Sequence, residues 1–113
     1  MITLNESDEV LLAQVQAKVV DAKTAGLVRD TLLDVVPRYR RFILDMHACN
    51  LVDSGGLAGM VTLLKGMKAN NCELVLCNLN KPVVSLFQLT RMDRLFKIEA
   101  DLSAAQAFFK GAA

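Results

Sequence analysis

The sequence has few of the side chains that build disulfide frameworks or metal sites. It contains three cysteines with no CxxC spacing and a single histidine, His47. A disulfide framework or a zinc site would need paired cysteines or further ligands at suitable spacing. The cysteines stand in apolar surroundings, which favours buried free thiols at Cys49, Cys72 and Cys77. We therefore expect no metal, no cofactor and a structural role for His47.

Long apolar runs and an excess of one charge are also missing. Apolar residues make up 53% of the chain, but no uninterrupted run approaches the roughly 20 residues that cross a bilayer. Residues 1–7 lack the basic stretch and apolar run of a secretory signal. The net charge of +1 provides no general field for nucleic acid or anionic lipid. These absences predict a cytoplasmic protein that binds neither membranes nor nucleic acid.

The length and the apolar periodicity predict one α/β domain over residues 1–113. A chain of 113 residues can bury a core but cannot also hold a separate substrate domain. Two short strands, with Ile2 and Leu4 in the first and Val10–Val15 as the second, enclose a polar turn at 5–9. Further strands are expected at 42–45, 74–77 and 95–98.

Helical periodicity fills the segments between these strands. The first helix follows Asp21, with Thr24 as its cap and Pro37 as its limit, and the second opens at Ser54. The third contains Pro82 in its first turn, and Asp101 caps the last. The expected fold is a mixed, mostly parallel sheet of about four to five strands with about four helices and right-handed crossovers.

The most informative stretch is DMHACNLVDSGGL, residues 45–57, where a buried strand leads to a turn at the start of a helix. Ser54 is expected at or next to the N-cap, where helix amides lack partners and the macrodipole favours negative charge, so a phosphate would be accommodated. Gly55 and Gly56 remove side chains that would otherwise screen the hydroxyl. Local chemistry also allows a simpler interpretation, in which Ser54 only caps the helix and the glycines only form the turn.

Three stretches resemble the STAS domain, the module of anti-sigma factor antagonists. They read VVDAKTA, FILDMHACNLVDSGGL and ELVLCNLNKPVVSLFQLTRMDRLFKI, and the resemblance extends from about Ile2 to Phe109. In that family, the anti-sigma factor is a serine kinase with a histidine-kinase-like ATP fold, and it phosphorylates the loop serine that follows an aspartate. The resemblance assigns this position to Ser54. Where the family pattern usually has a second serine or threonine, this chain has Gly55.

The resemblance also maps three aspartates of the family pattern onto this chain: Asp53 beside the phosphoacceptor, Asp45 at the end of the preceding strand, and Asp21 before the first helix. Asp53 and Asp21 could orient the serine, meet a partner's cation and repel the phosphate, or they could satisfy turn amides. We expect mixed roles for Asp53 and a mainly structural role for Asp45. Ala58 and Thr62 fall on the outer face of the second helix, which could accept a flat partner or pack within this domain. The predicted partner-binding residues are Asp21, Asp53, Ser54, Gly55, Gly56, Ala58 and Thr62.

The resemblance implies partner switching in a bacterial signalling pathway by a protein that is not itself an enzyme. The unmodified protein would bind an anti-sigma serine kinase and free a sigma factor, phosphorylation of Ser54 would release it, and a PP2C-type phosphatase would reset it. The chain has no G-x-x-x-x-G-K-[ST] loop, so ATP belongs to the kinase. The oligomeric state is left open between a monomer and a weak dimer.

Two other functions are alternatives to partner switching. A hydrolase with Ser54 as its nucleophile would need a base, but His47 stands at the other end of the loop and no G-x-S-x-G motif is present. The second alternative is a non-switching STAS scaffold, such as a subunit of a lipid transporter or of a stressosome-like assembly.

Overall fold

A mixed β-sheet forms the centre of the fold. Across residues 2–7 and 9–111, which the computed structural model describes, five strands join in the order β1-β2-β4-β6-β7. The strands are β1 (Ile2–Ser7), β2 (Val10–Val15), β4 (Arg41–Asp45), β6 (Glu73–Cys77) and β7 (Lys97–Glu99). The β1–β2 pair is antiparallel and the other pairs are parallel. The predicted mixed, mostly parallel sheet is confirmed.

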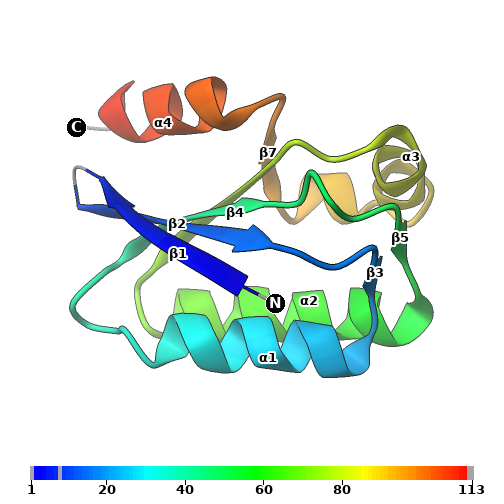
Figure 1. Ribbon diagram of the computed structural model, residues 1–113, viewed down its shortest axis with the longest axis horizontal. Helices are drawn as coiled ribbons and strands as arrows, with labels where there is room; N and C mark the ends of the chain where they lie inside the picture. Colours follow the sequence, from blue (N-terminus) through cyan, green and yellow to red (C-terminus); the bar gives the residue numbers. More distant parts are fainter. Residues whose placement is uncertain (1, 8, 112–113) are drawn as a thin grey trace.

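The helices cover both faces of this sheet, as Figure 1 shows. Helices α1 (Ala22–Leu33) and α2 (Ser54–Ala69) lie side by side on one face, and α4 (Leu102–Gly111) lies on the other. Helix α3 (Lys81–Leu89) and the 3-10 helix η1 (Met92–Arg94) stand near one end of the sheet. No helix among the described residues is long and apolar enough to cross a membrane.

Alternation along the central strands divides the core in two. On β4, Phe42 and Leu44 join the large core under α1 and α2, whereas Ile43 points into a smaller core with Ala105 and Phe109 of α4. The side chains of a strand alternate between its two faces, so a run of apolar residues on one strand serves both layers. Because both faces of β4 are covered, all three of these residues are at most 2% exposed.

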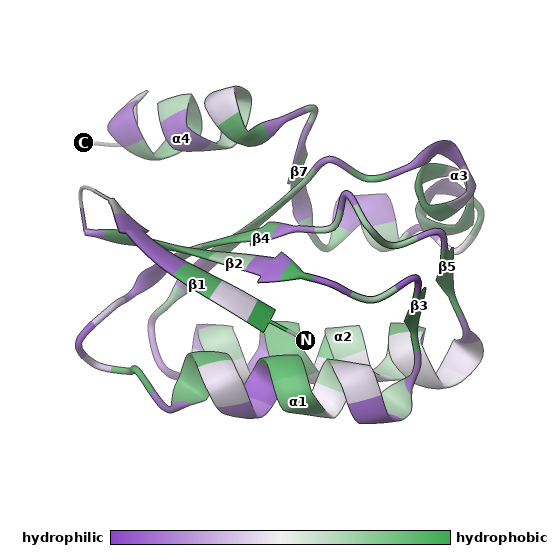
Figure 2. Ribbon diagram, viewed as in Figure 1, coloured by the Kyte–Doolittle hydropathy of each residue, from purple (hydrophilic) through white to green (hydrophobic). Residues whose placement is uncertain are grey.

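A second, very short sheet lies beside the starts of α1 and α2. It consists of β3 (Val19–Val20) and β5 (Leu51–Val52), paired in parallel with Val19 opposite Leu51 and Val20 opposite Val52. Both strands are strongly apolar in Figure 2. One residue separates each strand from the helix that follows it, so this pairing brings the two helix N-termini to the same end of the molecule (Figure 1).

Several boundaries differ from the expectations. Thr24 does not cap α1: the helix begins at Ala22, and the Asp21 carboxylate accepts a hydrogen bond from the Thr24 amide at 2.8 Å. Strand β1 continues to Ser7, which shortens the expected turn. The last strand begins at Lys97 because the chain forms η1 just before it.

The cap of the last helix follows the prediction. Asp101 Oδ1 accepts a hydrogen bond from the amide of Ala104 at 2.8 Å, and the Asp101 carbonyl accepts one from Ala105 at 3.0 Å. An aspartate side chain that bonds the amide three residues ahead satisfies one of the helix's orphan donors. The predicted role of Asp101 is therefore confirmed.

Candidate functional site

The start of α2 combines a capped helix end with an exposed serine. Asp53 is the N-cap: its Oδ1 accepts a hydrogen bond from the Gly56 amide at 2.7 Å, and its carbonyl accepts one from Leu57 at 2.8 Å. Ser54 follows as the first helical residue and its side chain is exposed. The amides of Ser54 and Gly55 have no intrahelical acceptor, as for any first turn. In the part of the chain that the structure describes, the Ser54 hydroxyl makes no hydrogen bond, and it lies at the positive end of the helix dipole.

The fold requires glycine at position 56 for a steric reason that the sequence did not reveal. A Cβ atom at this position would lie 1.9 Å from the carbonyl oxygen of Val20, so only glycine lets α2 begin against β3. The Asp53 amide donates to the same oxygen at 3.1 Å. Gly56 is buried, so its absent side chain permits this contact rather than clearing space above Ser54.

Gly55 and the start of α1 lie close together. A Cβ atom at Gly55 would stand 3.2 Å from the Cβ atom of Ala22 and 3.5 Å from Asp53 Oδ1. Asp21 caps α1 as Asp53 caps α2, since each directly follows one strand of the β3–β5 pair. The backbone hydrogen bond from Thr24 is the main cause that lowers the pKa of Asp21 below its usual value. Two capping carboxylates and one serine thus share one end of the molecule.

The outer face of α2 continues this surface. Ala58 and Thr62 are both exposed, and the Thr62 hydroxyl donates to the Ala58 carbonyl of its own helix at 3.2 Å. Val19 and Leu51, the paired outward residues of β3 and β5, are 42% and 52% exposed. We call Val19, Asp21, Leu51, Asp53, Ser54, Gly55, Ala58 and Thr62 the Ser54 surface. The sequence analysis did not identify Val19 and Leu51 as surface residues near Ser54, because two-residue strands show no periodicity.

Asp45 lies at the end of β4 and is 3% exposed. Its carboxylate accepts hydrogen bonds from Gln14 Nε2 at 3.2 Å, Asn78 Nδ2 at 3.1 Å and the His47 amide at 3.0 Å. Burial alone would raise the pKa of Asp45, but these hydrogen bonds outweigh it and hold the pKa below its usual value. The carboxylate joins three strand ends, which agrees with the structural role expected for it.

The loop after β4 is held in place by the side-chain amide of Asn80 and by the backbone amide of Asn50. Asn80 Nδ2 donates to the carbonyls of His47 at 3.1 Å and Cys49 at 2.8 Å, and the Asn50 amide donates to the Lys18 carbonyl at 2.8 Å. The sequence marked Asn80 only as the residue before a helix, and its reach across 31 residues is visible only in the fold.

The contacts of His47 and the burial of the three cysteines fit structural roles for these residues. His47 Nδ1 lies 3.1 Å from Asp45 Oδ1, and no hydrogen bond joins His47 to Ser54 within residues 2–7 and 9–111. Burial raises the pKa of all three thiols, that of Cys77 to about 12. The cysteines are free and buried, as predicted. Over the same residues, no cluster of His, Cys, Asp and Glu side chains is suited to hold a metal ion.

Comparison with known proteins finds one family and several similar structures. The model of the STAS domain family matches residues 1–105. The protein named "Putative anti-sigma factor antagonist BtrV" from Bordetella bronchiseptica is 29% identical over 111 residues, which are 98% of this chain and 96% of that protein. A similarly named crystal structure from Thermotoga maritima, tm1081, has a TM-score of 0.80 at 22% identity and covers 94% of this chain and 92% of its own. The Bacillus cell fate determinant SpoIIAA in its phosphorylated form has a TM-score of 0.68 at 13% identity, over 96% and 99% of the two chains.

Proposed function

The chain belongs to the STAS domain family, and from this premise we propose that it is an anti-sigma factor antagonist whose binding to a serine kinase is switched by phosphorylation of Ser54. The unmodified protein binds the anti-sigma kinase and frees a sigma factor. Phosphorylation, with ATP bound by the kinase, releases the protein, and a PP2C-type phosphatase restores it. The name of the Bordetella relative supports the class of partner.

The observation that carries this proposal is that Asp53, and not Ser54, caps α2. Asp53 supplies the capping oxygen, so the exposed Ser54 hydroxyl is not needed to close the helix. A hydroxyl used as a cap would be held by backbone amides and would have to leave them to react. Ser54 is free to enter a kinase active site without opening the helix end.

A phosphate on Ser54 is compatible with the fold of the domain but unfavourable for binding of the partner. Phosphorylation adds about 1.5 to 2 negative charges, which the free amides and dipole of a helix N-terminus stabilise. The new charge stands beside the carboxylate of Asp53, at the end of the molecule that also holds Asp21. A partner that makes close contact there meets added bulk and repulsion, so the complex dissociates faster.

The partner surface proposed around Ser54 is small-featured and partly apolar. Ala58 and Thr62 give α2 a low outer face, and Val19 and Leu51 offer exposed apolar side chains three residues or fewer from a capping aspartate. Standard interfaces bury about 800 Å² per partner, so a partner that docks on Ser54 also covers residues around it. Apolar side chains such as those of Val19 and Leu51 are typical of the buried core of such a patch.

The first test is phosphate transfer. The purified protein is incubated with ATP and lysate of its native bacterium, and its intact mass and phosphopeptides are measured. We expect one phosphate on the unmodified protein and none on Ser54→Ala. Ser103→Ala is the matched control, because Ser103 is also exposed in the first turn of an Asp-capped helix. Phosphate that remains on Ser54→Ala would contradict the assignment.

The second test is partner retention. Ser54→Ala, Ser54→Asp and phosphorylated protein serve as baits, and retained proteins are identified by mass spectrometry. An ATP-binding serine kinase on the alanine bait, with clear loss on the charged baits, is the expected result. A membrane transporter or a large assembly retained equally by all baits would favour a non-switching scaffold instead.

A further inference from the structure

A cleft with a volume of about 330 Å³ lies between α3, η1 and β7. None of its lining residues belongs to the Ser54 surface. Leu79 follows the end of β6, whereas Lys97 and Ile98 are the first two residues of β7, so the cleft stands beside the carboxyl end of β6. Ligands of open α/β sheets bind outside such strand ends, and small-molecule pockets begin at roughly 300 Å³.

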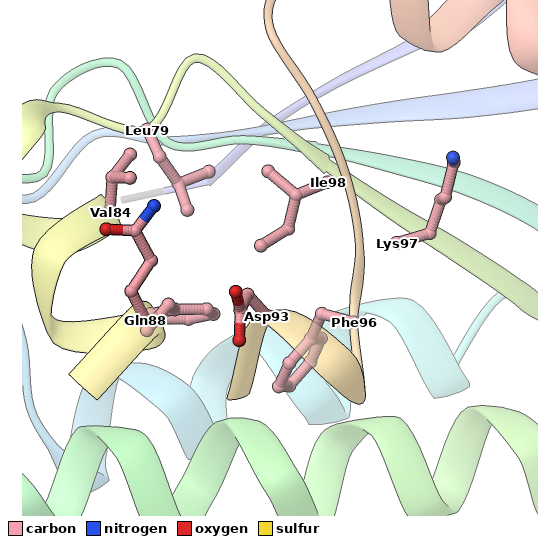
Figure 3. Close-up of a pocket in the computed structure, with 8 residues that line it drawn as sticks. Leu79, Val84, Gln88, Asp93, Phe96, Lys97 and Ile98 are labelled. Atoms are coloured by element: carbon pink, nitrogen blue, oxygen red, sulfur yellow. The ribbon is translucent and has the colours of Figure 1, made fainter. Parts of the chain in front are cut away.

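The walls of the cleft are apolar and firmly packed. Leu79, Val84 and Ile98 surround the open space in Figure 3, and Phe87 also lines the cleft. Phe87 is 1% exposed, and its ring lies 5.6 Å from that of Phe96, centroid to centroid. A ligand would therefore meet a preformed apolar wall and would not have to order it, which lowers the entropic cost of binding.

One carboxylate points into this space. In Figure 3 the Asp93 carboxylate stands among the apolar walls with the Gln88 amide nearby. Among the residues that the structure describes, Asp93 takes part in no ion pair. Lys97 borders the cleft, but its ammonium points away from it, 3.1 Å from Glu99 Oε2 and 5.0 Å from the ring centroid of Phe108. Of the charged side chains that line the cleft, Asp93 is thus the one that faces the cavity.

We propose that this cleft binds a small organic cation, an amidinium, guanidinium or primary ammonium on a compact apolar body. The two oxygens of Asp93 accept charge-assisted hydrogen bonds from such a group, and an amidinium can donate two in parallel. The apolar body packs against Leu79, Val84 and Ile98, the partly exposed apolar side chains that line the cleft. A carboxylate ligand of the same shape is repelled by Asp93.

The charge requirement is tested with three ligands of one shape. Benzamidine, neutral benzamide and anionic benzoate are titrated into ¹⁵N-labelled protein, and amide chemical shifts are followed by NMR. We expect saturable benzamidine shifts centred on Leu79, Gln88, Asp93 and Ile98. Benzamide should bind about tenfold more weakly, because hydrogen bonds to charged groups contribute more than neutral ones, and benzoate should cause no shifts there. Equal binding of benzamidine and benzamide, or benzamidine shifts elsewhere only, would overturn the proposal.

The contribution of Asp93 is isolated with a matched pair of variants. Asp93→Asn keeps the size of an exposed side chain and removes its charge. It should weaken benzamidine binding about tenfold. Asp34→Asn makes the same change at an exposed site after α1 and should leave the affinity unchanged. An unchanged affinity in Asp93→Asn, or an equal loss in both variants, would contradict the proposal whether or not Ser54 is phosphorylated.

Discussion

At the start of α2, capping and exposure fall to neighbouring residues. Asp53 accepts the Gly56 amide at 2.7 Å, and Ser54 lies one residue inside the helix with its side chain exposed. A serine is an equally good N-cap in general, so the sequence Asp-Ser left the assignment open. Which of the two residues is the cap matters, because only the other one can be modified without disturbing the helix end.

Asp53 is expected to have separable effects on stability and on binding. Asp53→Ala removes the capping oxygen and should lower the free energy of unfolding by about 1 kcal/mol, measured by urea denaturation. Asp53→Ser restores a capping oxygen without the charge and should recover most of that loss. If Asp53→Ser is as unstable as Asp53→Ala, the carboxylate stabilises the fold by something other than its cap. If Asp53→Ser is stable, its retention of the kinase measures the effect of the Asp53 charge on binding, separate from the effect of the cap on stability.

Asp45 should make the folded state sensitive to acid. Hydrogen bonds hold its folded pKa below 3.8, the usual value. The resulting stabilisation is therefore present above that value and is lost as the pH falls through the lower folded pKa. Asp45→Asn places an amide donor opposite the donors of Gln14 or Asn78, so at about pH 6 it should cost about 1 to 3 kcal/mol of unfolding free energy.

The measurement for Asp45 is urea denaturation as a function of pH. The difference between Asp45→Asn and the unmodified protein should shrink as the solution is acidified below the usual carboxyl pKa. Asp34→Asn is the control: its exposed side chain stands at the C-cap of α1, so loss of its charge should stabilise the protein slightly, by less than about 1 kcal/mol, the opposite sign to Asp45→Asn. A difference that stays constant down to the acid transition would show that the charge of Asp45 is not what the fold uses.

At the scale of elements, α2 depends on close contacts with β3 and α1. A Cβ atom at Gly56 would lie 1.9 Å from the backbone oxygen of Val20, and one at Gly59 would lie 2.5 Å from the Cβ atom of Ala25. The first obstacle is backbone, which cannot move aside without disturbing the β3–β5 pair. The helix therefore begins where glycine allows it to approach.

Two glycine-to-alanine variants of the same helix should have opposite effects. Gly56→Ala should destabilise the protein by more than about 3 kcal/mol, because overpacking against backbone forces the helix away from β3. Gly66→Ala should stabilise it by up to about 1 kcal/mol, because the nearest atom to its new Cβ would be a Leu33 methyl at 3.7 Å. Both are measured by urea denaturation. A Gly56→Ala protein as stable as the unmodified one would refute the close approach.

The same contacts explain what the sequence could and could not predict. The helical periodicity of α1 and α2 marks the buried face of each helix, and the continuous apolar runs of β4 and β6 mark strands covered on both faces. These elements are predictable in order and in parallel pairing. Thr24 and Asp21 both have capping side chains three residues apart, and only the fold decides that Asp21 is the cap. Val19 and Leu51 lie on strands of two residues, too short for any period. The reach of Asn80 and the need for Gly56 depend on residues far away in the chain.

For the whole molecule, the three thiols should report on cooperative folding. Cys49, Cys72 and Cys77 lie in a loop, after α2 and at the end of β6, and each is at most 6% exposed. Burial raises the pKa of each thiol, so little reactive thiolate is present in the folded state. At about pH 8, iodoacetamide should label all three only as urea unfolds the protein. Rapid labelling of one cysteine without urea would reveal local opening instead of a single cooperative unit.

The proposed switch should change the surface of the molecule and leave its fold intact. A phosphate on Ser54 gains roughly 0.3 to 1 kcal/mol from the helix N-terminus, which repulsion from Asp53 partly offsets, so the unfolding free energy should change by less than about 1 kcal/mol. Amide NMR shifts should be confined to residues 19–23 and 51–58. Phosphoserine at position 103 is the control: it too should leave the fold intact, but it should not release the kinase. Shifts that spread to α4, or new reactivity of Cys77, would mean that phosphorylation acts by loosening the domain. Loss of kinase binding would then be explained without a direct contact between the kinase and Ser54.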